Sequence, residues 1–116
     1  MEQLLALLVP SDILSHFDFE SVEKINGVYR IGLIEKKDSS HIPASIIYKG
    51  SAVLDGYMNP IELQTFPIKA TEVFLYLKRR KWKDHISKNH FNNYEFTQQG
   101  LKATKEFAAF LKEIGR

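Results

Sequence analysis

The fold is decided by residues 72–83, Glu72-Val-Phe-Leu-Tyr-Leu-Lys-Arg-Arg-Lys-Trp-Lys83, where an apolar run passes directly into a basic tract. Residues 73–77 are aliphatic or aromatic at every position, which is typical of a strand covered on both faces. Residues 78–83 hold five Lys or Arg around the single tryptophan of the chain, Trp82. The stretch therefore predicts a central strand that ends in concentrated positive charge.

Turn-forming residues upstream of this strand predict two β-hairpins. Residues 61–66 alternate between apolar and polar side chains, and a short connection leads from them into the 72–77 strand. Earlier in the chain, Asn26-Gly27 separates two β-forming runs, and both residues tolerate the positive φ of a tight turn. We expect further short strands at residues 46–48 and 94–96, where the pattern is weaker.

Both ends of the chain are expected to be helical. Near the start, leucines recur at helical spacing, and Pro10 suits the first turn of a second short helix. Near the end, an amphipathic stripe at i, i+3, i+4 and i+7 follows the predicted N-cap Thr104; its members are Phe107, Phe110, Leu111 and Ile114.

These elements predict an α+β fold in one domain, residues 1–116. We expect a helical N-terminus over 1–17, an antiparallel sheet of hairpins over 18–96, and a C-terminal amphipathic helix over 101–115. The hydrophobic content of 44% is sufficient for a single core.

The charge of the chain is unevenly distributed. Residues 1–68 carry five Lys or Arg against nine Asp or Glu, a balance of −4, while residues 69–116 carry eleven against five, a balance of +6. The net charge of +2 therefore conceals a dipolar molecule. Such asymmetry indicates contact with a nucleic acid or another acidic surface. Lysines also protect exposed strand edges from aggregation, so the tract has a purely structural interpretation too.

The absence of cysteine excludes disulfides, thiolate nucleophiles and cysteine zinc sites. The apolar opening run is short and has no preceding Lys or Arg, so it fits neither a signal peptide nor a membrane span. We expect a cytoplasmic protein with no membrane partner.

The residues that could carry chemistry are few. His85 and His90 lie near Asp84, but their spacing matches no known zinc-ligand pair. Ser39 and Ser40 precede His41, although adjacency in a loop does not orient a base for a nucleophile. No glycine-rich phosphate loop is present. We expect no metal, no cofactor and no catalytic residue, which also disfavours a metal-dependent nuclease.

Binding to nucleic acid requires the residues that this chain has. Lys and Arg neutralise phosphates and release counterions, and a planar ring stacks on bases. Trp82 has two interpretations that the sequence leaves open, a base contact or a side chain that closes the core.

The tract and its surroundings resemble the N-terminal region of insertion-sequence transposases that are common in Bacteroidetes, the ISAon group of the Asp-Asp-Glu type. The resemblance rests on Thr65-Phe-Pro-Ile68, on the strand that ends Lys78-Arg-Arg-Lys-Trp82, and on Phe107-Ala-Ala-Phe-Leu-Lys-Glu-Ile114. More distantly, the chain resembles transposases whose N-terminal module is a cysteine zinc ribbon. The resemblance then implies a degenerate ribbon without zinc, with Trp82 filling the place of the metal.

The resemblance implies binding to double-stranded DNA at the terminal inverted repeats of a mobile element. Strand cleavage would belong to a catalytic domain outside these residues, so the chain itself is expected not to be an enzyme. Nucleic-acid contact is assigned to the tract and to weaker candidates after it: Lys78, Arg79, Arg80, Lys81, Trp82, Lys83, Lys88, Lys102 and Lys105.

An alternative remains open, a non-catalytic protein-protein interaction or dimerisation module. In that case the leucine-rich N-terminus and the stripe from Phe107 to Ile114 would contact the transposase catalytic domain or a second copy of the chain, and the basic tract would only keep a strand edge soluble.

Overall fold

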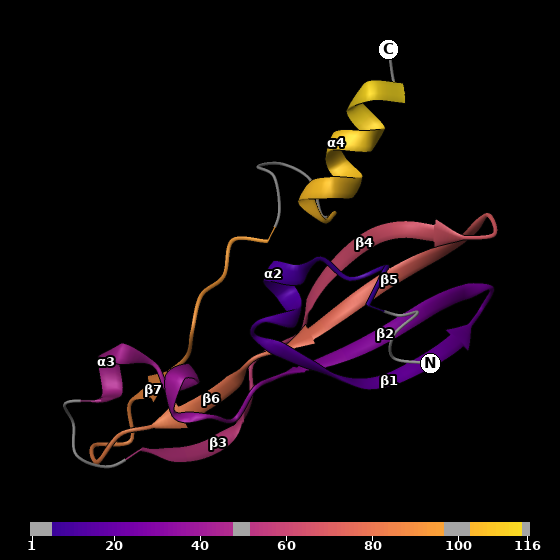
Figure 1. Cartoon of the computed structure of the whole chain (residues 1–116). Coiled ribbons are helices and arrows are strands. Elements are labelled where there is room, and N and C mark those ends of the chain that lie inside the picture. Colours follow the sequence, from indigo (N-terminus) through magenta and orange to yellow (C-terminus); the bar gives the residue numbers. More distant parts are fainter. Residues whose placement is uncertain (1–5, 48–51, 97–102, 115–116) are drawn as a thin grey trace.

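Two β-hairpins form the framework of the computed structural model (Figure 1). The second hairpin continues into a two-stranded ribbon, formed by residues 53–57 and 80–83. The structure describes residues 6–47, 52–96 and 103–114. The predicted α+β class is confirmed, because strands in two sheets are accompanied by short helices and one longer helix. In chain order the elements are α2 (Ser11–Leu14), β1 (Phe17–Ile25), β2 (Val28–Glu35), the 3-10 turn η1 (Ser39–His41), α3 (Ala44–Ile47), β3 (Val53–Tyr57), β4 (Ile61–Ile68), β5 (Thr71–Lys78), β6 (Arg80–Lys83), β7 (Asn89–His90) and α4 (Lys105–Ile114).

The large sheet has the strand order β1-β2-β5-β4 and contains both predicted hairpins. Asn26 and Gly27 join β1 to β2 with φ of 51° and 80°. Lys69 and Ala70 join β4 to β5 with φ of 47° and 65°, so this turn adopts left-handed backbone without a glycine. The prediction that the 72–77 strand is central is confirmed, since β5 lies between β2 and β4.

The pairing between the hairpins corrects the sequence prediction. Strands β2 and β5 run parallel, with Ile31 opposite Leu75 and Leu33 opposite Leu77, so the sheet is mixed rather than wholly antiparallel. Parallel neighbours require a long crossover, and residues 36–70, between β2 and β5, provide it. That crossover holds η1, α3, β3 and β4.

A small sheet, β3-β6-β7, continues the second hairpin. Strand β5 passes through Arg79 into β6, and β3 leads through residues 58–60 into β4, so the β3-β6 pair extends the β4-β5 pair. The two sheets lie end to end along the molecule (Figure 1). The radius of gyration of 16.0 Å therefore exceeds the ~13 Å of a compact domain of this length.

Two local predictions are wrong. Residues 46 and 47 belong to helix α3, not to a strand, because Pro43 begins a turn whose carbonyl accepts the Ile46 N–H at 3.0 Å. Residues 94–96 form no regular strand, since the rings of Tyr94 and Phe96 instead stack on each other and pack against Phe17. The short helix predicted after Pro10 is present as α2, and β1 begins at residue 17. Residues 1–5 and 48 lie outside the described residues.

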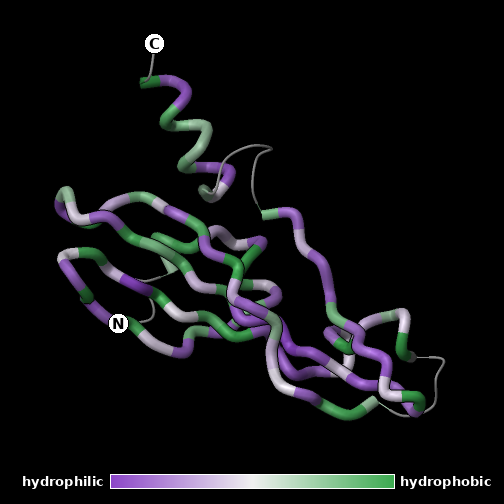
Figure 2. The backbone as a smooth tube through the Cα atoms, turned by 180° about the vertical axis from the view of Figure 1, so that it is seen from behind, coloured by the Kyte–Doolittle hydropathy of each residue, from purple (hydrophilic) through white to green (hydrophobic). Residues whose placement is uncertain are grey.

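The core covers one face of the large sheet. Its fully buried members alternate along the strands, as the period of two requires; they are Ile31, Leu33, Leu63, Val73, Leu75 and Leu77. Ile13 of α2 and Phe17 of β1 pack on this face as well. Figure 2 shows hydrophobic residues recurring along these strands. Within the described ranges, no helix is long and apolar enough to span a membrane.

Helix α4 contacts the sheet edge at β4 only through its first turns. Thr104 is the N-cap as predicted, because its Oγ1 accepts the Phe107 N–H at 3.3 Å. The Phe107 ring packs edge-on against Phe66 with centroids 5.1 Å apart, and both Phe107 and Ala108 are buried. The rest of α4 extends away from the sheets (Figure 1). Consequently Phe110, Leu111 and Ile114 remain 42%, 39% and 62% exposed.

Candidate nucleic-acid interface

The basic tract lies where the ribbon passes from the large sheet to the small one. Lys78 ends β5, and β6 begins at Arg80. Between them, the Arg79 carbonyl accepts the Met58 N–H at 3.0 Å. Along β6 the side chains alternate, so Trp82 faces the interior while Lys81 and Lys83 share the opposite face.

Trp82 closes the small sheet from inside. It is 7% exposed and pairs with Leu54 on one side and His90 on the other. A ring buried in this way is not open to a nucleic-acid base. The sequence left open whether Trp82 contacts a base or closes the core, and in the structure its side chain closes the core.

Arg80 fastens the small sheet to the large one. Its Nε donates to the Glu35 carbonyl at 2.9 Å, and its backbone N–H donates to Glu35 Oε1 at 2.9 Å. Glu35 is fully buried at the end of β2 and also accepts from Asn92 Nδ2 at 3.0 Å and from the Tyr94 hydroxyl. Burial, followed by the hydrogen bond to Glu35, raises the pKa of Tyr94 well above its usual range, so the phenol stays protonated and donates. Arg80 therefore has a structural role.

Arg79 and Lys78 also have partners within the molecule. The Arg79 guanidinium lies 5.1 Å from the Phe91 ring centroid, and its Nη1 donates to the Asn92 carbonyl at 3.2 Å. Lys78 Nζ contacts Glu20 Oε1 at 2.7 Å, and that hydrogen bond raises the pKa of the lysine. Both groups are partly exposed.

Lys81 and Lys83 share one carboxylate. Asp55 Oδ2 lies 3.8 Å from Lys81 Nζ and 3.4 Å from Lys83 Nζ. All three side chains are partly exposed, so the cluster is at the surface. The acidic partner comes from β3, which the sequence did not predict as a strand.

The weaker candidates are not brought together. Lys88 is exposed in the turn between β6 and β7, near the tract. Lys105 is exposed at the start of α4, which packs on β4 at the other end of the molecule. Lys102 lies outside the described residues.

The charges separate by sheet once the chain is folded. We call the small sheet and its neighbouring segments the basic lobe (residues 36–47, 52–60 and 79–96), and the remaining described residues the acidic lobe (6–35, 61–78 and 103–114). The basic lobe has seven Lys or Arg against four Asp or Glu, a balance of +3. The acidic lobe has six against nine, a balance of −3. The dipole that the sequence indicated therefore runs along the length of the molecule.

A hydrogen-bonded chain that the sequence did not predict holds the basic lobe together. Ser45 Oγ of α3 contacts His90 Nδ1 at 2.8 Å, and His90 Nε2 contacts Asp84 Oδ2 at 2.8 Å. Asp84 Oδ1 also accepts the backbone N–H groups of Ile86 and Lys88. The hydrogen bond to His90 is the main reason that the pKa of Asp84 is lowered to about 2. Ser, His and Asp are the residue types of a nucleophilic triad, but here the carboxylate mainly orders the β6-β7 turn.

A second histidine cluster joins the two lobes. Asp38 contacts His41 Nδ1, and His41 Nε2 lies 2.9 Å from His16 Nδ1, between α2 and β1. Ser40 donates to Asp38 at 2.6 Å, which together with His41 lowers the pKa of Asp38. In the part of the chain that the structure describes, no group of three or more His, Asp or Glu is placed to hold a metal ion.

Comparison with known proteins adds no family to these observations. No family model matches the chain, and neither a curated protein nor a solved structure matches it.

Proposed function

We propose that this chain is a DNA-binding module of the kind found at the N-terminus of insertion-sequence transposases, and that its basic lobe contacts the backbone of double-stranded DNA. The observation that carries the proposal is the separation of charge by sheet, with +3 gathered on the small sheet and its loops. A surface of one sign attracts a polyanion over distances comparable to the molecule at low salt.

The contacts that we assign to DNA are partly or fully exposed cations of the basic tract and of the turn that follows it. They are Lys78, Arg79, Lys81, Lys83 and Lys88. Arg80 acts by fixing the small sheet to Glu35, and Trp82 by filling its interior, so both support the surface without touching DNA.

The internal partners of these cations do not prevent phosphate contact. A solvent-exposed ion pair contributes only about 0–1 kcal/mol, since water and salt compete with it. A backbone phosphate carries one negative charge, as a carboxylate does, but duplex DNA offers a row of them, and each new contact also releases counterions. Lys78 and Glu20 are both more than one-third exposed, so their pair opens readily.

The test is a titration of labelled duplex DNA followed by fluorescence anisotropy at about 50 mM and about 200 mM salt. Lys81→Ala with Lys83→Ala should weaken binding about tenfold and reduce the slope of log K against log salt by roughly 2, because two phosphate contacts are lost. Arg79→Ala with Arg80→Ala is a poor choice, because it removes the contact between Arg80 and Glu35 as well.

The matched control is Lys24→Ala with Lys112→Ala, which removes the same charge from the acidic lobe. It should change the affinity less than about threefold, because neither lysine is assigned a phosphate contact and only the net charge changes. If both double variants weaken binding equally, the basic lobe is not the contact surface. If the native protein binds no duplex at either salt concentration, the proposal fails.

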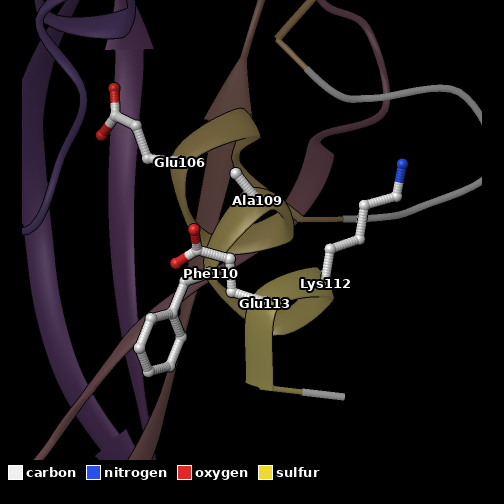
Figure 3. A pocket seen from close by; sticks show the side chains of 5 residues that line it. All are labelled: Glu106, Ala109, Phe110, Lys112 and Glu113. Carbon is white, nitrogen blue, oxygen red and sulfur yellow. The ribbon is translucent and has the colours of Figure 1, made fainter. Parts of the chain in front are cut away.

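Helix α4 favours a second candidate function, self-association of the chain. Phe110 and Leu111 are both partly exposed. Figure 3 shows Phe110 and Lys112 pointing to different sides of the helix. Surface helices of globular proteins usually bury their apolar stripe, so this one is suited to packing against a second copy of itself.

Self-association would be measured by light scattering during gel filtration at several concentrations. Leu111→Ser should shift a dimer towards monomer, whereas Ala109→Ser on the same exposed helix should not. A native protein that remains monomeric at high concentration excludes this candidate and leaves the DNA-binding proposal unaffected.

A further inference from the structure

Asp55 lies in a β-bulge that aims its carboxylate across the ribbon. Leu54 pairs with Trp82 and Tyr57 pairs with Arg80, so Asp55 and Gly56 together stand opposite one residue, Lys81. Gly56 has φ of 82°, a conformation that side-chain-bearing residues rarely adopt, which explains the glycine. Bulges of this kind redirect a side chain relative to a regular strand.

The redirected carboxylate meets both lysines with one atom. Oδ2 lies 3.4 Å from Lys83 Nζ and 3.8 Å from Lys81 Nζ. Lys81 and Lys83 are two residues apart on one face of β6, so their ammonium groups converge on the same position. A negatively charged oxygen between two ammonium groups is also the arrangement that these lysines would present to one phosphate oxygen.

We propose that Asp55 is a built-in competitor of DNA phosphate: its carboxylate occupies the position of one backbone phosphate between Lys81 and Lys83 and must be displaced when duplex DNA binds. The inference rests on the proposed DNA-binding function and adds a regulating residue to that surface. Because the Asp55 carboxylate must first be displaced, the affinity for duplex DNA is lowered. This holds for any DNA sequence, because phosphate contacts carry no sequence information. Asp55 thereby sets the strength of sequence-independent binding.

The experiment compares Asp55→Asn with Asp18→Asn. Both substitutions remove one negative charge and keep the shape of the side chain. Asp18 is exposed on β1 in the acidic lobe, so it reports the effect of net charge alone. Each variant and the native protein would be titrated with a mixed-sequence duplex at about 50 mM and about 200 mM salt.

Asp55→Asn should raise the affinity about threefold to tenfold at the lower salt and steepen the slope of log K against log salt by roughly 1. Asp18→Asn should raise it less than about twofold, since Asp55 and not Asp18 supplies the carboxylate that lies between Lys81 and Lys83. Equal gains from the two variants, or no gain from Asp55→Asn, would overturn the inference. Asp55→Ser is a second variant with the same expected direction.

A second titration separates failure of this inference from failure of the proposed function. Tripolyphosphate would be added to native and Asp55→Asn protein while the backbone amide signals of Lys81 and Lys83 are followed by NMR. Larger shifts at these amides in Asp55→Asn support competition by the carboxylate, even if neither protein binds duplex DNA. Equal shifts in the two proteins overturn the competition whatever the duplex titration shows.

Discussion

The large sheet is stabilised by apolar packing, whereas the small sheet is stabilised mainly by buried polar groups. Six aliphatic side chains of β2, β4 and β5 form the core of the former. In the latter, Trp82 and Ile46 are buried together with polar residues such as His41, Asp84 and His90. Hydrophobic contacts tolerate changes of pH and salt, while hydrogen-bonded ion pairs depend on both. The stability of the basic lobe should therefore depend more on pH and salt than that of the acidic lobe.

Glu35 connects the two halves, because it ends β2 in the large sheet and binds three groups of the basic lobe. A buried carboxylate requires compensating donors, and here a backbone N–H, an amide and a phenol supply them. The end-to-end arrangement of the two sheets thus depends on one polar junction, in addition to the continuous strands.

The largest effect is expected in the core of the large sheet. Leu75→Ala removes a fully buried side chain from the central strand, so it should lower the free energy of unfolding by about 3–4 kcal/mol. Urea unfolding followed by circular dichroism would measure the loss. A loss below about 1 kcal/mol would contradict the placement of β5 at the centre of the core.

The junction should have the next largest effect. Glu35→Ala leaves the Arg80 N–H, Asn92 and Tyr94 without their shared acceptor, so we expect about 2–3 kcal/mol of destabilisation. Hydrogen exchange should rise mainly in residues 79–96. Tyr94→Phe is the control, since it removes only one donor and should lower stability by about 1 kcal/mol. Equal effects of the two variants would mean that Glu35 is not a shared acceptor.

Acid should loosen the small sheet before the large one. The pKa of Asp84 is about 2 in the folded protein and 3.8 for an unperturbed carboxyl group. Because the folded value is the lower one, the stabilisation is fully present above pH ~4 and is lost as the pH falls towards ~2. NMR hydrogen exchange at Ile86 and Lys88 should therefore rise in this window, while the amides of β5 stay protected.

Asp84→Asn is the control for this acid effect. The asparagine of this variant would keep an acceptor oxygen for the Ile86 and Lys88 amides but has no proton to gain, so their protection should show no step between pH ~4 and ~2. Simultaneous loss of protection in both sheets of the native protein would show that acid acts globally and not through Asp84.

The smallest effect concerns the two hairpin turns of the large sheet. Ala70 has φ of 65° where a glycine would be unstrained, so Ala70→Gly should stabilise the protein by about 0.5–1 kcal/mol. Gly27→Ala makes the opposite exchange at φ of 80°, so it should destabilise the protein by about 1 kcal/mol. Thermal unfolding of both variants would measure the two changes in stability. Changes of the same sign would contradict the backbone conformation of one turn.

Local chemistry explains which parts of the fold were predictable. Asn26-Gly27 fixes a tight turn by its own conformational preferences, and the apolar run at 73–77 favours a place inside the sheet. Only one face of that strand is fully buried, since Phe74 and Tyr76 on the other face are partly exposed. The parallel pairing of β2 with β5 depends on how two hairpins meet, and neither hairpin encodes it. Strand β3 was missed because Leu54-Asp-Gly-Tyr57 contains a bulge, which breaks the alternation of a regular strand.

The candidate site divides in the same way. The concentration of cations at 78–83 is visible in the sequence, but their partners come from distant segments: Glu20, Glu35 and Asp55. Whether a charged residue faces solvent or an acid is a property of the tertiary fold. The unequal charge of the two chain segments was the more informative pattern, because it survives folding as a separation between lobes.

The central claim is that duplex DNA contacts the basic lobe and the bordering Lys78. The most direct measurement is an NMR titration of the isotope-labelled full chain with a short duplex, following every backbone amide. The account predicts shifts concentrated at residues 78–83 and 88, with α4 and the turn at residues 26–27 unchanged. Shifts on α4 or at this turn, or no shifts at low salt, would contradict it.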